Sequence, residues 1–198
     1  MSPDARRRRS LRLPGYDYSQ SNAYFVTICA AHKKFLFGNI KDGIMRLSEA
    51  GQVVAEEWLK TAKLRPYVTL DESVVMPNHF HGILWVGETP KEGTARRAPT
   101  MERFGKPVKG SLPTIIGAFK AAATRRINAL RNSGKGGVWQ RGYYEHVIRD
   151  DVSWNRIREY IINNPLNWEF DRENLDRKGE DKFYCWLASF KTRPTGKM

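Results

Sequence analysis

The stretch VTLDESVVMPNHFHGILWV, residues 68–86, decides the fold. Two runs rich in β-branched and large apolar residues, 68–75 and 82–86, flank the hexapeptide MPNHFH. Such runs are typical of strands, and the short polar stretch between them is typical of a tight connection. The sequence therefore predicts an antiparallel pair of strands that leads into and out of the hexapeptide.

The segments on either side of this pair complete a familiar order of elements. The run YFVTICA, residues 24–30, predicts a buried strand, and residues 138–148 predict another. Apolar residues recur at helical spacing from 48 to 65 and from 111 to 130, which predicts two amphipathic helices. We therefore expect an α+β, ferredoxin-like βαββαβ sandwich, with an antiparallel sheet and two helices on one face. A third helix, 152–163, is expected across the other face.

The domain boundaries follow from composition. We expect residues 1–22 to form a basic N-terminal arm, residues 23–170 the folded domain and residues 171–198 a C-terminal tail. Residues 87–111 are rich in Gly, Pro, Thr, Lys and Arg, and they indicate a loop.

The charge of the chain suggests a polyanionic partner. Its 34 Lys and Arg against 21 Asp and Glu give a net charge of +13, which attracts nucleic acid, although ribosomal proteins and proteins of anionic membranes are also basic. The two cysteines indicate neither a disulfide framework nor a cysteine zinc site. No segment approaches the length of an apolar membrane span, so we expect a cytoplasmic protein with no membrane partner.

Two pairs of residues are candidates for chemistry. His79 and His81 are one residue apart, so on a strand both imidazoles emerge on one face and Phe80 on the other, as a metal site requires. Tyr160 and Asn164 are four residues apart and share one face of the third predicted helix. Each pair also has a structural interpretation, since His-x-His alone is weak evidence, and tyrosines in the core and asparagines at helix ends are common.

Three blocks of sequence make the interpretation specific. They are MPNHFHGILWV (76–86), VWQRGYYEHVIRDD (138–151) and REYIINNPLNW (158–168), in that order. Together they resemble the signature blocks of the single-tyrosine HUH transposases (IS200-like), and most closely those of the REP-associated tyrosine transposases. The resemblance covers about residues 12–168.

The resemblance implies a role for each candidate residue. His79 and His81 would be the HUH pair that binds a divalent metal, Mg²⁺ or Mn²⁺, and Tyr160 would be the nucleophile. Asn164 takes the place where related insertion-sequence enzymes usually carry a glutamine metal ligand, and its amide oxygen is a suitable ligand although it is one methylene shorter.

The resemblance also implies a function. The protein would be a metal-dependent single-stranded DNA endonuclease and strand transferase that acts on hairpin, REP-like DNA through a 5′-phosphotyrosine intermediate, without ATP. We expect single-stranded or hairpin DNA as its partner, a monomer or homodimer, and association with the nucleoid. Basic and aromatic side chains suited to phosphates and unpaired bases are Arg6, Arg7, Arg8, Arg9, Arg12, Tyr16, Lys120, Arg125 and Arg141.

Other functions remain open at this point. A replication initiator or relaxase uses the same HUH chemistry, but usually with a different strand order or another histidine ligand. A non-catalytic or domesticated module would bind hairpin DNA or RNA through aromatic residues on the sheet, for which Tyr24, Phe25 and Tyr143 are candidates. An unrelated metalloenzyme with a His-x-His pair is the remaining alternative.

Overall fold

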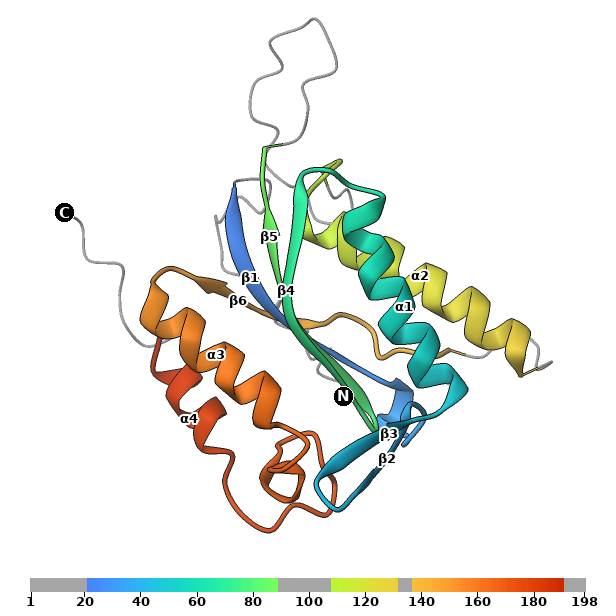
Figure 1. Cartoon of the computed structure of the whole chain (residues 1–198), viewed down its shortest axis with the longest axis vertical. Helices are drawn as coiled ribbons and strands as arrows, with labels where there is room; N and C mark the ends of the chain where they lie inside the picture. Colours follow the sequence, from blue (N-terminus) through green and yellow to red (C-terminus); the bar gives the residue numbers. More distant parts are fainter. Residues whose placement is uncertain (1–20, 89–107, 132–136, 191–198) are drawn as a thin grey trace, which may run out of the picture.

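The computed structural model describes residues 21–88, 108–131 and 137–190 (Figure 1). The strands are β1 (Asn22–Cys29), β2 (Gly38–Lys41), β3 (Ile44–Leu47), β4 (Val68–Met76), β5 (His79–Val86) and β6 (Tyr144–Ile148). The α-helices are α1 (Glu49–Lys63), α2 (Leu112–Leu130), α3 (Asp151–Asn163) and α4 (Lys182–Ser189), and the 3-10 helices are η1 (Ala31–Lys33) and η2 (Trp168–Phe170).

The main sheet has the order β4-β5-β1-β6, and each neighbouring pair is antiparallel. Together with α1 between β1 and β4 and α2 between β5 and β6, this is the βαββαβ sandwich that the sequence predicts. The pair of strands around the hexapeptide is β4 and β5, with Met76 opposite His79 at the turn. Strands β2 and β3 form a separate two-stranded hairpin between β1 and α1.

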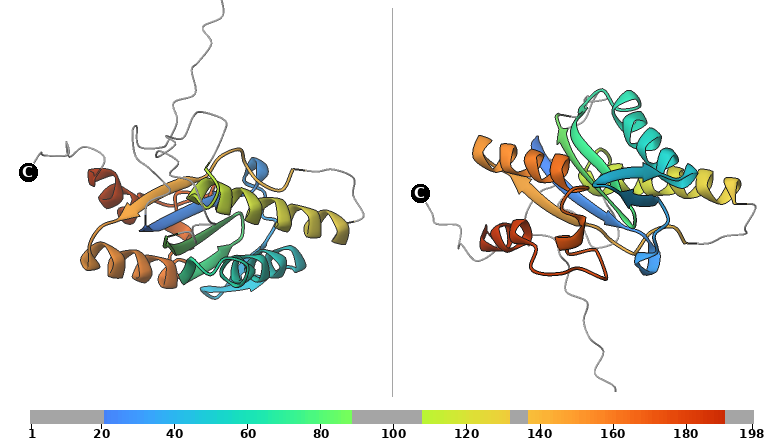
Figure 2. Two further views of the ribbon diagram at one scale, coloured as in Figure 1. Left: turned by 90° about the horizontal axis from the view of Figure 1, so that it is seen from above. Right: turned by 60° about the horizontal axis from the view of Figure 1, so that its bottom comes forward.

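Helices α1 and α2 cover one face of the sheet (Figure 2). Alternate residues of β1, Tyr24 and Val26 among them, point into this layer and are fully buried. The ring of Phe80 from β5 packs there against Trp58 of α1, with the ring centroids 4.7 Å apart, and against Phe119 of α2. This packing fixes which face of β5 points away from α1 and α2.

Helices α3 and α4 cover the other face of the sheet, as Figure 2 shows. Phe25 of β1 and Ile83 of β5 pack there against Ile157 and Ile161 of α3, which confirms the expected position of the third helix. Phe183, Tyr184 and Leu187 of α4 belong to the same cluster of buried residues.

The packing of α4 differs from the separate tail that we expected after residue 170. The segment 171–190 lies against the sheet and completes the second core. Its apolar run, 183–187, is too short to reveal a packed helix by periodicity alone, because it spans little more than one helical turn.

Local sequence signals explain where the helices begin and end. The hydroxyl of Ser48 accepts a hydrogen bond from the backbone N–H of Gly51, and the carboxylate of Asp150 accepts one from the N–H of Ser153 at 2.7 Å. Helix α3 ends at Asn163, two residues before Pro165, whose ring disfavours a helical residue before it.

The last strand is shorter than the sequence suggested. β6 begins at Tyr144, whereas the apolar pattern extends back to Val138. Trp139 makes only an isolated bridge to Ala30, and Gly142 has a φ of +81°, which breaks the strand geometry. The residues between Trp139 and Tyr144 therefore form a loop at the edge of the sheet.

Candidate active site

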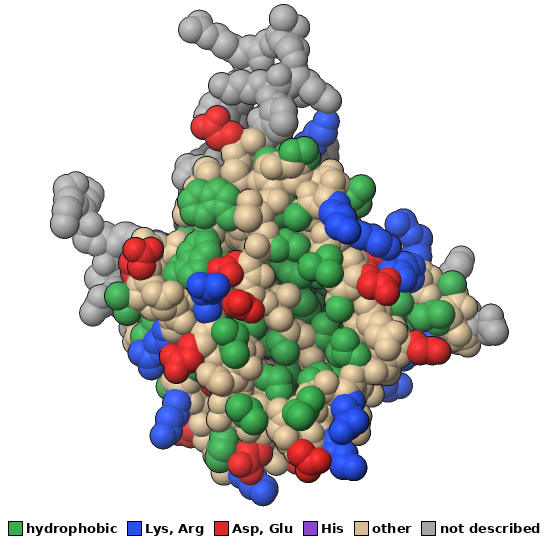
Figure 3. Space-filling view, in the orientation of Figure 1, with side chains coloured by type: hydrophobic (Ala, Val, Ile, Leu, Met, Phe, Trp, Pro, Cys, Tyr) green, Lys and Arg blue, Asp and Glu red, His purple; other side chains and the backbone are tan. Residues whose placement is uncertain are grey.

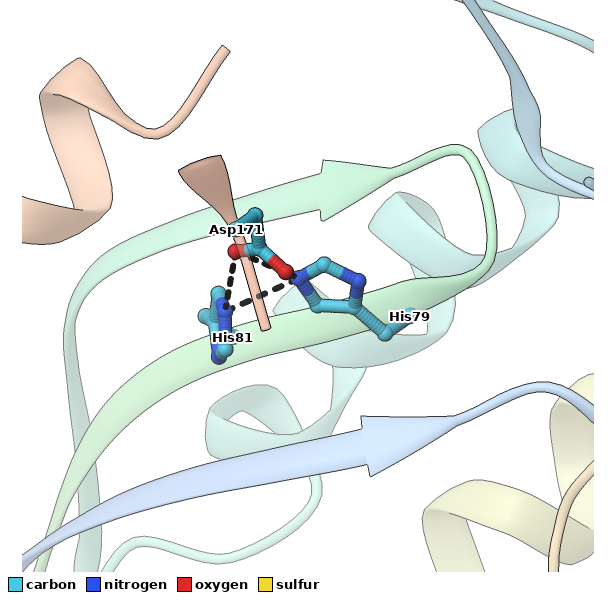
Figure 4. A group of neighbouring side chains, drawn as sticks. All are labelled: His79, His81 and Asp171. Carbon is cyan, nitrogen blue, oxygen red and sulfur yellow. Dashed lines mark hydrogen bonds and ion pairs between the residues drawn. The ribbon is translucent and has the colours of Figure 1, made fainter. Parts of the chain in front are cut away.

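His79 and His81 lie on β5 and project from the face opposite to Phe80, as the alternation of a strand requires. Both side chains are fully buried, and their Nε2 atoms are 2.9 Å apart (Figure 4). Two nitrogen lone pairs at that distance repel each other unless a proton or a cation lies between them.

The neighbours of His79 fix its tautomer. The amide nitrogen of Asn78 donates hydrogen bonds to the carbonyls of Glu173, at 2.8 Å, and Lys33, at 3.4 Å. The amide oxygen of Asn78 is therefore directed at Nδ1 of His79, 2.9 Å away, and because this oxygen only accepts, Nδ1 carries the hydrogen. Burial, and then the nearby His81, lower the pKa of His79 to about 3. At neutral pH, Nε2 of His79 therefore presents a lone pair.

His81 is held by a second set of contacts. Its Nδ1 lies 2.9 Å from the hydroxyl oxygen of Thr27, which in turn lies 2.7 Å from the phenolic oxygen of Tyr184. The imidazole also stacks on the ring of Phe25, with the ring centroids 5.3 Å apart. When Thr27 donates to Tyr184 and Nδ1 of His81 donates to Thr27, Nε2 of His81 is free to coordinate a cation.

Asp171 joins the two histidines, and sequence reasoning missed it. Its Oδ2 lies 3.8 Å from Nε2 of His79 and 3.9 Å from Nε2 of His81, and its side chain is fully buried (Figure 4). Burial raises the pKa of this carboxyl group, but the two imidazoles and the hydrogen bonds from its neighbours outweigh burial and hold the pKa well below the usual range. Asp171 is therefore a buried carboxylate beside the imidazole pair.

The same carboxylate contacts both residues that the sequence placed on the third helix. Oδ2 of Asp171 accepts a hydrogen bond from the phenol of Tyr160 at 3.0 Å and one from the amide nitrogen of Asn164 at 2.8 Å. The phenolic oxygen of Tyr160 also lies 3.4 Å from Nε2 of His81. The structure thus brings Tyr160, Asn164, His79 and His81 together around Asp171.

Tyr160 is held by a stack and by its acidic neighbours. Its ring lies parallel to that of Phe183, with 3.7 Å between centroids and 8° between planes. Its phenolic oxygen is also 3.5 Å from Oδ2 of Asp181. Burial, then Tyr184 and the carboxylates of Asp171 and Asp181, raise the pKa of Tyr160 well above its ordinary value. The phenol is therefore protonated and donates its one hydrogen to Asp171, the nearer of the two carboxylates.

These residues fit a divalent cation. Ligand atoms in adjacent positions around an octahedral Mg²⁺ ion lie about 3 Å apart, because each is about 2.1 Å from the ion, and the Nε2 atoms of His79 and His81 match that spacing. The amide oxygen of Asn164 is buried and has no hydrogen-bond partner among the described residues. An unsatisfied buried acceptor costs about 1–3 kcal/mol, and a cation would satisfy it. His79, His81 and Asp171 form a group with the composition and spacing of a metal site.

The predicted DNA-binding residues are distributed differently. Arg6, Arg7, Arg8, Arg9, Arg12 and Tyr16 lie outside the described residues. Arg125 is exposed on α2, which covers the face of the sheet opposite to the histidine pair. Arg141 is exposed on the loop before β6. The ammonium group of Lys120 donates to two backbone carbonyls of that loop, and burial lowers its pKa to about 8.

The described surface has mixed charge on the face shown in Figure 3, where Lys and Arg side chains alternate with Asp and Glu. Arg126, next to Arg125, pairs with Glu56 and Glu57 of α1 at 2.6 and 2.7 Å. Among the described residues, no helix combines the length and apolar character that crossing a bilayer requires.

Two proteins of Haemophilus influenzae are similar to the chain over most of its length. An uncharacterised protein of Haemophilus influenzae is 42% identical over 172 residues, which cover 85% of this chain and 94% of that protein. A putative REP-associated tyrosine transposase of the same organism is 24% identical over 173 residues, covering 83% of this chain and 86% of that protein. The chain thus resembles a REP-associated tyrosine transposase over most of its length. The resemblance of the three sequence blocks is thereby confirmed.

Two solved structures align with most of the chain. A REP-associated tyrosine transposase bound to a REP hairpin aligns with a TM-score of 0.48 and 17% identity, over 78% of this chain and 73% of that one. A putative transposase from Deinococcus radiodurans aligns with a TM-score of 0.42 and 17% identity, over 77% of this chain and 95% of that one. No family model matches the chain.

Proposed function

We propose that this protein is a REP-associated tyrosine transposase, a metal-dependent single-stranded DNA endonuclease and strand transferase that acts on hairpin DNA. The observation that carries the proposal is the position of the Tyr160 phenol, 3.4 Å from Nε2 of His81 and 3.0 Å from Oδ2 of Asp171. A nucleophile, a buried imidazole pair and a buried carboxylate converge at one point, and a purely structural tyrosine does not need these neighbours.

His79, His81 and Asp171 would hold the divalent metal, with Asn164 supplying an amide oxygen. When bound, the metal would supply a positive charge that neutralises a phosphate oxygen and orients the phosphodiester. His79 suits this role because its Nδ1 hydrogen is fixed by Asn78 and its Nε2 lone pair faces His81.

Tyr160 would perform the covalent chemistry. Its phenolic oxygen forms a bond to phosphorus while the bond from phosphorus to the 3′ oxygen breaks, so the 5′ end becomes attached to Tyr160 and a 3′ hydroxyl is released. The phenolic proton leaves along its hydrogen bond to Oδ2 of Asp171, 3.0 Å away, and is balanced by the proton that the departing 3′ oxygen takes up to become the hydroxyl. A later attack by a 3′ hydroxyl reverses these bonds and rejoins DNA without ATP.

One alternative from the sequence keeps Tyr143, which is half-buried, but not Tyr24 and Phe25. A module that binds RNA or DNA on an open sheet would need exposed aromatic side chains there. Tyr24 and Phe25 are both fully buried, because helices cover both faces of the sheet. Nucleic acid therefore has no access to these two rings in the folded chain.

The test is a covalent adduct. Purified protein is incubated with labelled single-stranded DNA carrying the hairpin and flank found beside its own gene, with Mn²⁺ or with EDTA, and resolved on denaturing gels. Wild type should give a metal-dependent protein–DNA adduct, and Tyr160→Phe should bind the hairpin but give none. Tyr67→Phe, which removes a phenol from the other core, is the matched control and should behave as wild type.

One result would replace the proposal. If wild type binds the hairpin tightly but forms no adduct with Mn²⁺ or Mg²⁺ on either strand, the catalytic assignment fails and the protein is a hairpin-binding module.

A further inference from the structure

A cavity of about 730 Å³ lies beside the candidate active site. It is bounded by the loop before β6 and by residues between Arg172 and Ala188. Thr27 and Asp181 are part of its wall, and they contact His81 at 2.9 Å and Tyr160 at 3.5 Å. The cavity is therefore separated from the imidazole pair and from the phenol by single side chains.

The wall of the cavity has flat aromatic groups. Tyr143 and Tyr144, both half-buried, line it, whereas the ring of Tyr184 is buried and covered by the guanidinium group of Arg172, 4.2 Å from the ring centroid. A nucleobase stacks on such rings whatever its identity, and each stacked base contributes about 1–3 kcal/mol to binding. A volume of this size is also within the range of about 300–1,000 Å³ that is usual for small-ligand sites, so one nucleotide fits.

The charges on the wall favour an anion. The carboxylate of Glu173 is neutralised by Lys33 and Arg172, each 3.1 Å away. The guanidinium groups of Arg141 and Arg177 also line the cavity, and neither has a hydrogen-bond or ion-pair partner within the described part of the chain. Glu180 and Asp181 also line the cavity, so four basic side chains stand against three acidic ones and the wall has a net charge of +1. The two unpaired arginines are the groups on this wall that suit a phosphate.

Lys120 explains how Arg141 is held at the edge of this cavity. Its ammonium nitrogen donates to the carbonyls of Gln140 and Gly142, the residues on either side of Arg141, at 2.8 Å each. The indole N–H of Trp139 donates to the backbone carbonyl of Lys120 at 3.2 Å. Helix α2 therefore holds the loop through hydrogen bonds to the residues before and after Arg141. Because the ammonium group of Lys120 is occupied by these two carbonyls, Lys120 is not itself the phosphate contact.

We infer that this cavity binds one unpaired nucleotide of the DNA strand, next to the phosphate that Tyr160 attacks. Arg141 binds the phosphate of that nucleotide, the tyrosine rings stack on its base, and Lys120 is a positioning residue for Arg141. The inference rests on the proposed function for the identity of the strand.

The first test measures binding without cleavage. Fluorescence anisotropy in EDTA compares two labelled probes, the hairpin with its single-stranded flank from beside the gene and the same hairpin without the flank. Arg141→Ala should bind the flanked probe about 10-fold more weakly, with a salt dependence reduced by about one phosphate contact, and the flankless probe unchanged. Arg46→Ala, an equal loss of charge on an exposed residue of β3 outside the cavity, should bind both probes as wild type does.

The second test separates positioning from contact. Lys120→Met should weaken binding of the flanked probe about as much as Arg141→Ala, and the double variant should bind no more weakly than either single variant, because both remove the same contact. Additive losses would mean that Lys120 acts independently of Arg141, and the positioning role would be wrong.

The third test locates the base. 5-Iododeoxyuridine is placed at each flank position in turn, crosslinked by light in EDTA and mapped by mass spectrometry. We expect one position to crosslink to a peptide containing Tyr143 and Tyr144. If no position does so and Arg141→Ala binds both probes as wild type does, the cavity is not a nucleotide site, even where wild type forms the covalent adduct. If the crosslink appears but the adduct never does, the nucleotide site stands and the proposed chemistry fails.

Discussion

The phenol of Tyr160 donates a hydrogen bond to Oδ2 of Asp171 at 3.0 Å. This contact links α3, which carries the proposed nucleophile, to the segment after η2, which carries the carboxylate. The same oxygen lies 3.8 Å from Nε2 of His79, so one side chain contacts both parts of the site. Asp171 is therefore the residue whose replacement most directly tests whether the site is a metal centre.

We predict that Asp171→Asn lowers the affinity for Mn²⁺ by at least about 10-fold, because it removes a negative charge beside the imidazole pair while keeping the shape of the side chain. Isothermal titration calorimetry measures the affinity, and circular dichroism checks the fold. Asp176→Asn is the matched control, since Asp176 lies on the exposed surface five residues away. Equal affinity in both variants and wild type would show that Asp171 is not a ligand.

Asp171 is the residue of the candidate site that the sequence did not predict. His79, His81, Tyr160 and Asn164 were found because strands and helices repeat with fixed periods, so spacing predicts which side chains share a face. Asp171 follows a 3-10 turn in an irregular segment, and no period relates it to the others. Only the path of the chain after α3 brings it to the histidine pair.

The fold was predictable for a related reason. The sequence order of β1, α1, β4, β5, α2, β6 and α3 was predictable, because each of these elements contributes buried apolar residues that recur with the period of a strand or of a helix. The start of β6 was not predictable, since Gly142 interrupts an apolar pattern that otherwise extends back to Val138. The packing of α4 was not predictable either, because this helix has only eight residues. Both features border the proposed nucleotide cavity.

A second prediction concerns Gly82, next to the histidine pair on β5. A methyl group added there would lie 2.7 Å from the Trp58 ring and 2.9 Å from that of Phe80, both buried in a packed core. Gly82→Ala should therefore lower the free energy of unfolding by about 1–3 kcal/mol in urea denaturation. Gly117→Ala is the control, because a methyl group on that exposed face of α2 meets nothing within 4 Å, and it should raise the free energy of unfolding by about 0.5–1 kcal/mol. Similar stabilities for the two variants would contradict the packing described around β5.

A third prediction concerns the ion pair between α1 and α2. Burial, the largest single influence, raises the pKa of Glu57, but hydrogen bonds from Lys60 and Arg126 outweigh it and hold the pKa below its ordinary value. A carboxylate with a lowered pKa in the folded state stabilises the protein above its unfolded pKa, and this contribution is lost as the pH falls through the folded value. The pair therefore contributes at neutral pH and fades in acid.

Arg126→Met should accordingly lower the free energy of unfolding by about 0.5–1 kcal/mol at pH 7, a small effect because Arg126 is 38% exposed and solvent screens the pair. The deficit should shrink as the pH falls to about 3. Urea denaturation across this pH range measures it, with Arg125→Met, an exposed neighbour, as the control. A deficit that stays constant with pH would mean that Arg126 stabilises the protein through packing of its stem and not through charge.

The last prediction tests whether α4 belongs to the active site. The ring of Phe183 is 8% exposed and lies parallel to that of Tyr160 at 3.7 Å, so it restricts the plane in which the phenol can turn. Phe183→Ala should lower the free energy of unfolding by about 3–5 kcal/mol, because it leaves a cavity in the second core. Phe183→Leu restores most of the apolar volume but not the flat surface, and should cost less stability.

The two variants therefore separate stability from positioning. If the stack orients the nucleophile, Phe183→Leu should form the covalent DNA adduct several-fold more slowly than wild type in single-turnover assays at a temperature where both are folded, while binding the hairpin equally well. Leu59→Ala, on an exposed position of α1, is the control and should leave the rate unchanged. An adduct rate in Phe183→Leu equal to that of wild type would mean that the polar neighbours of the phenol orient it without the stack, and that Phe183 contributes to the core but not to the chemistry.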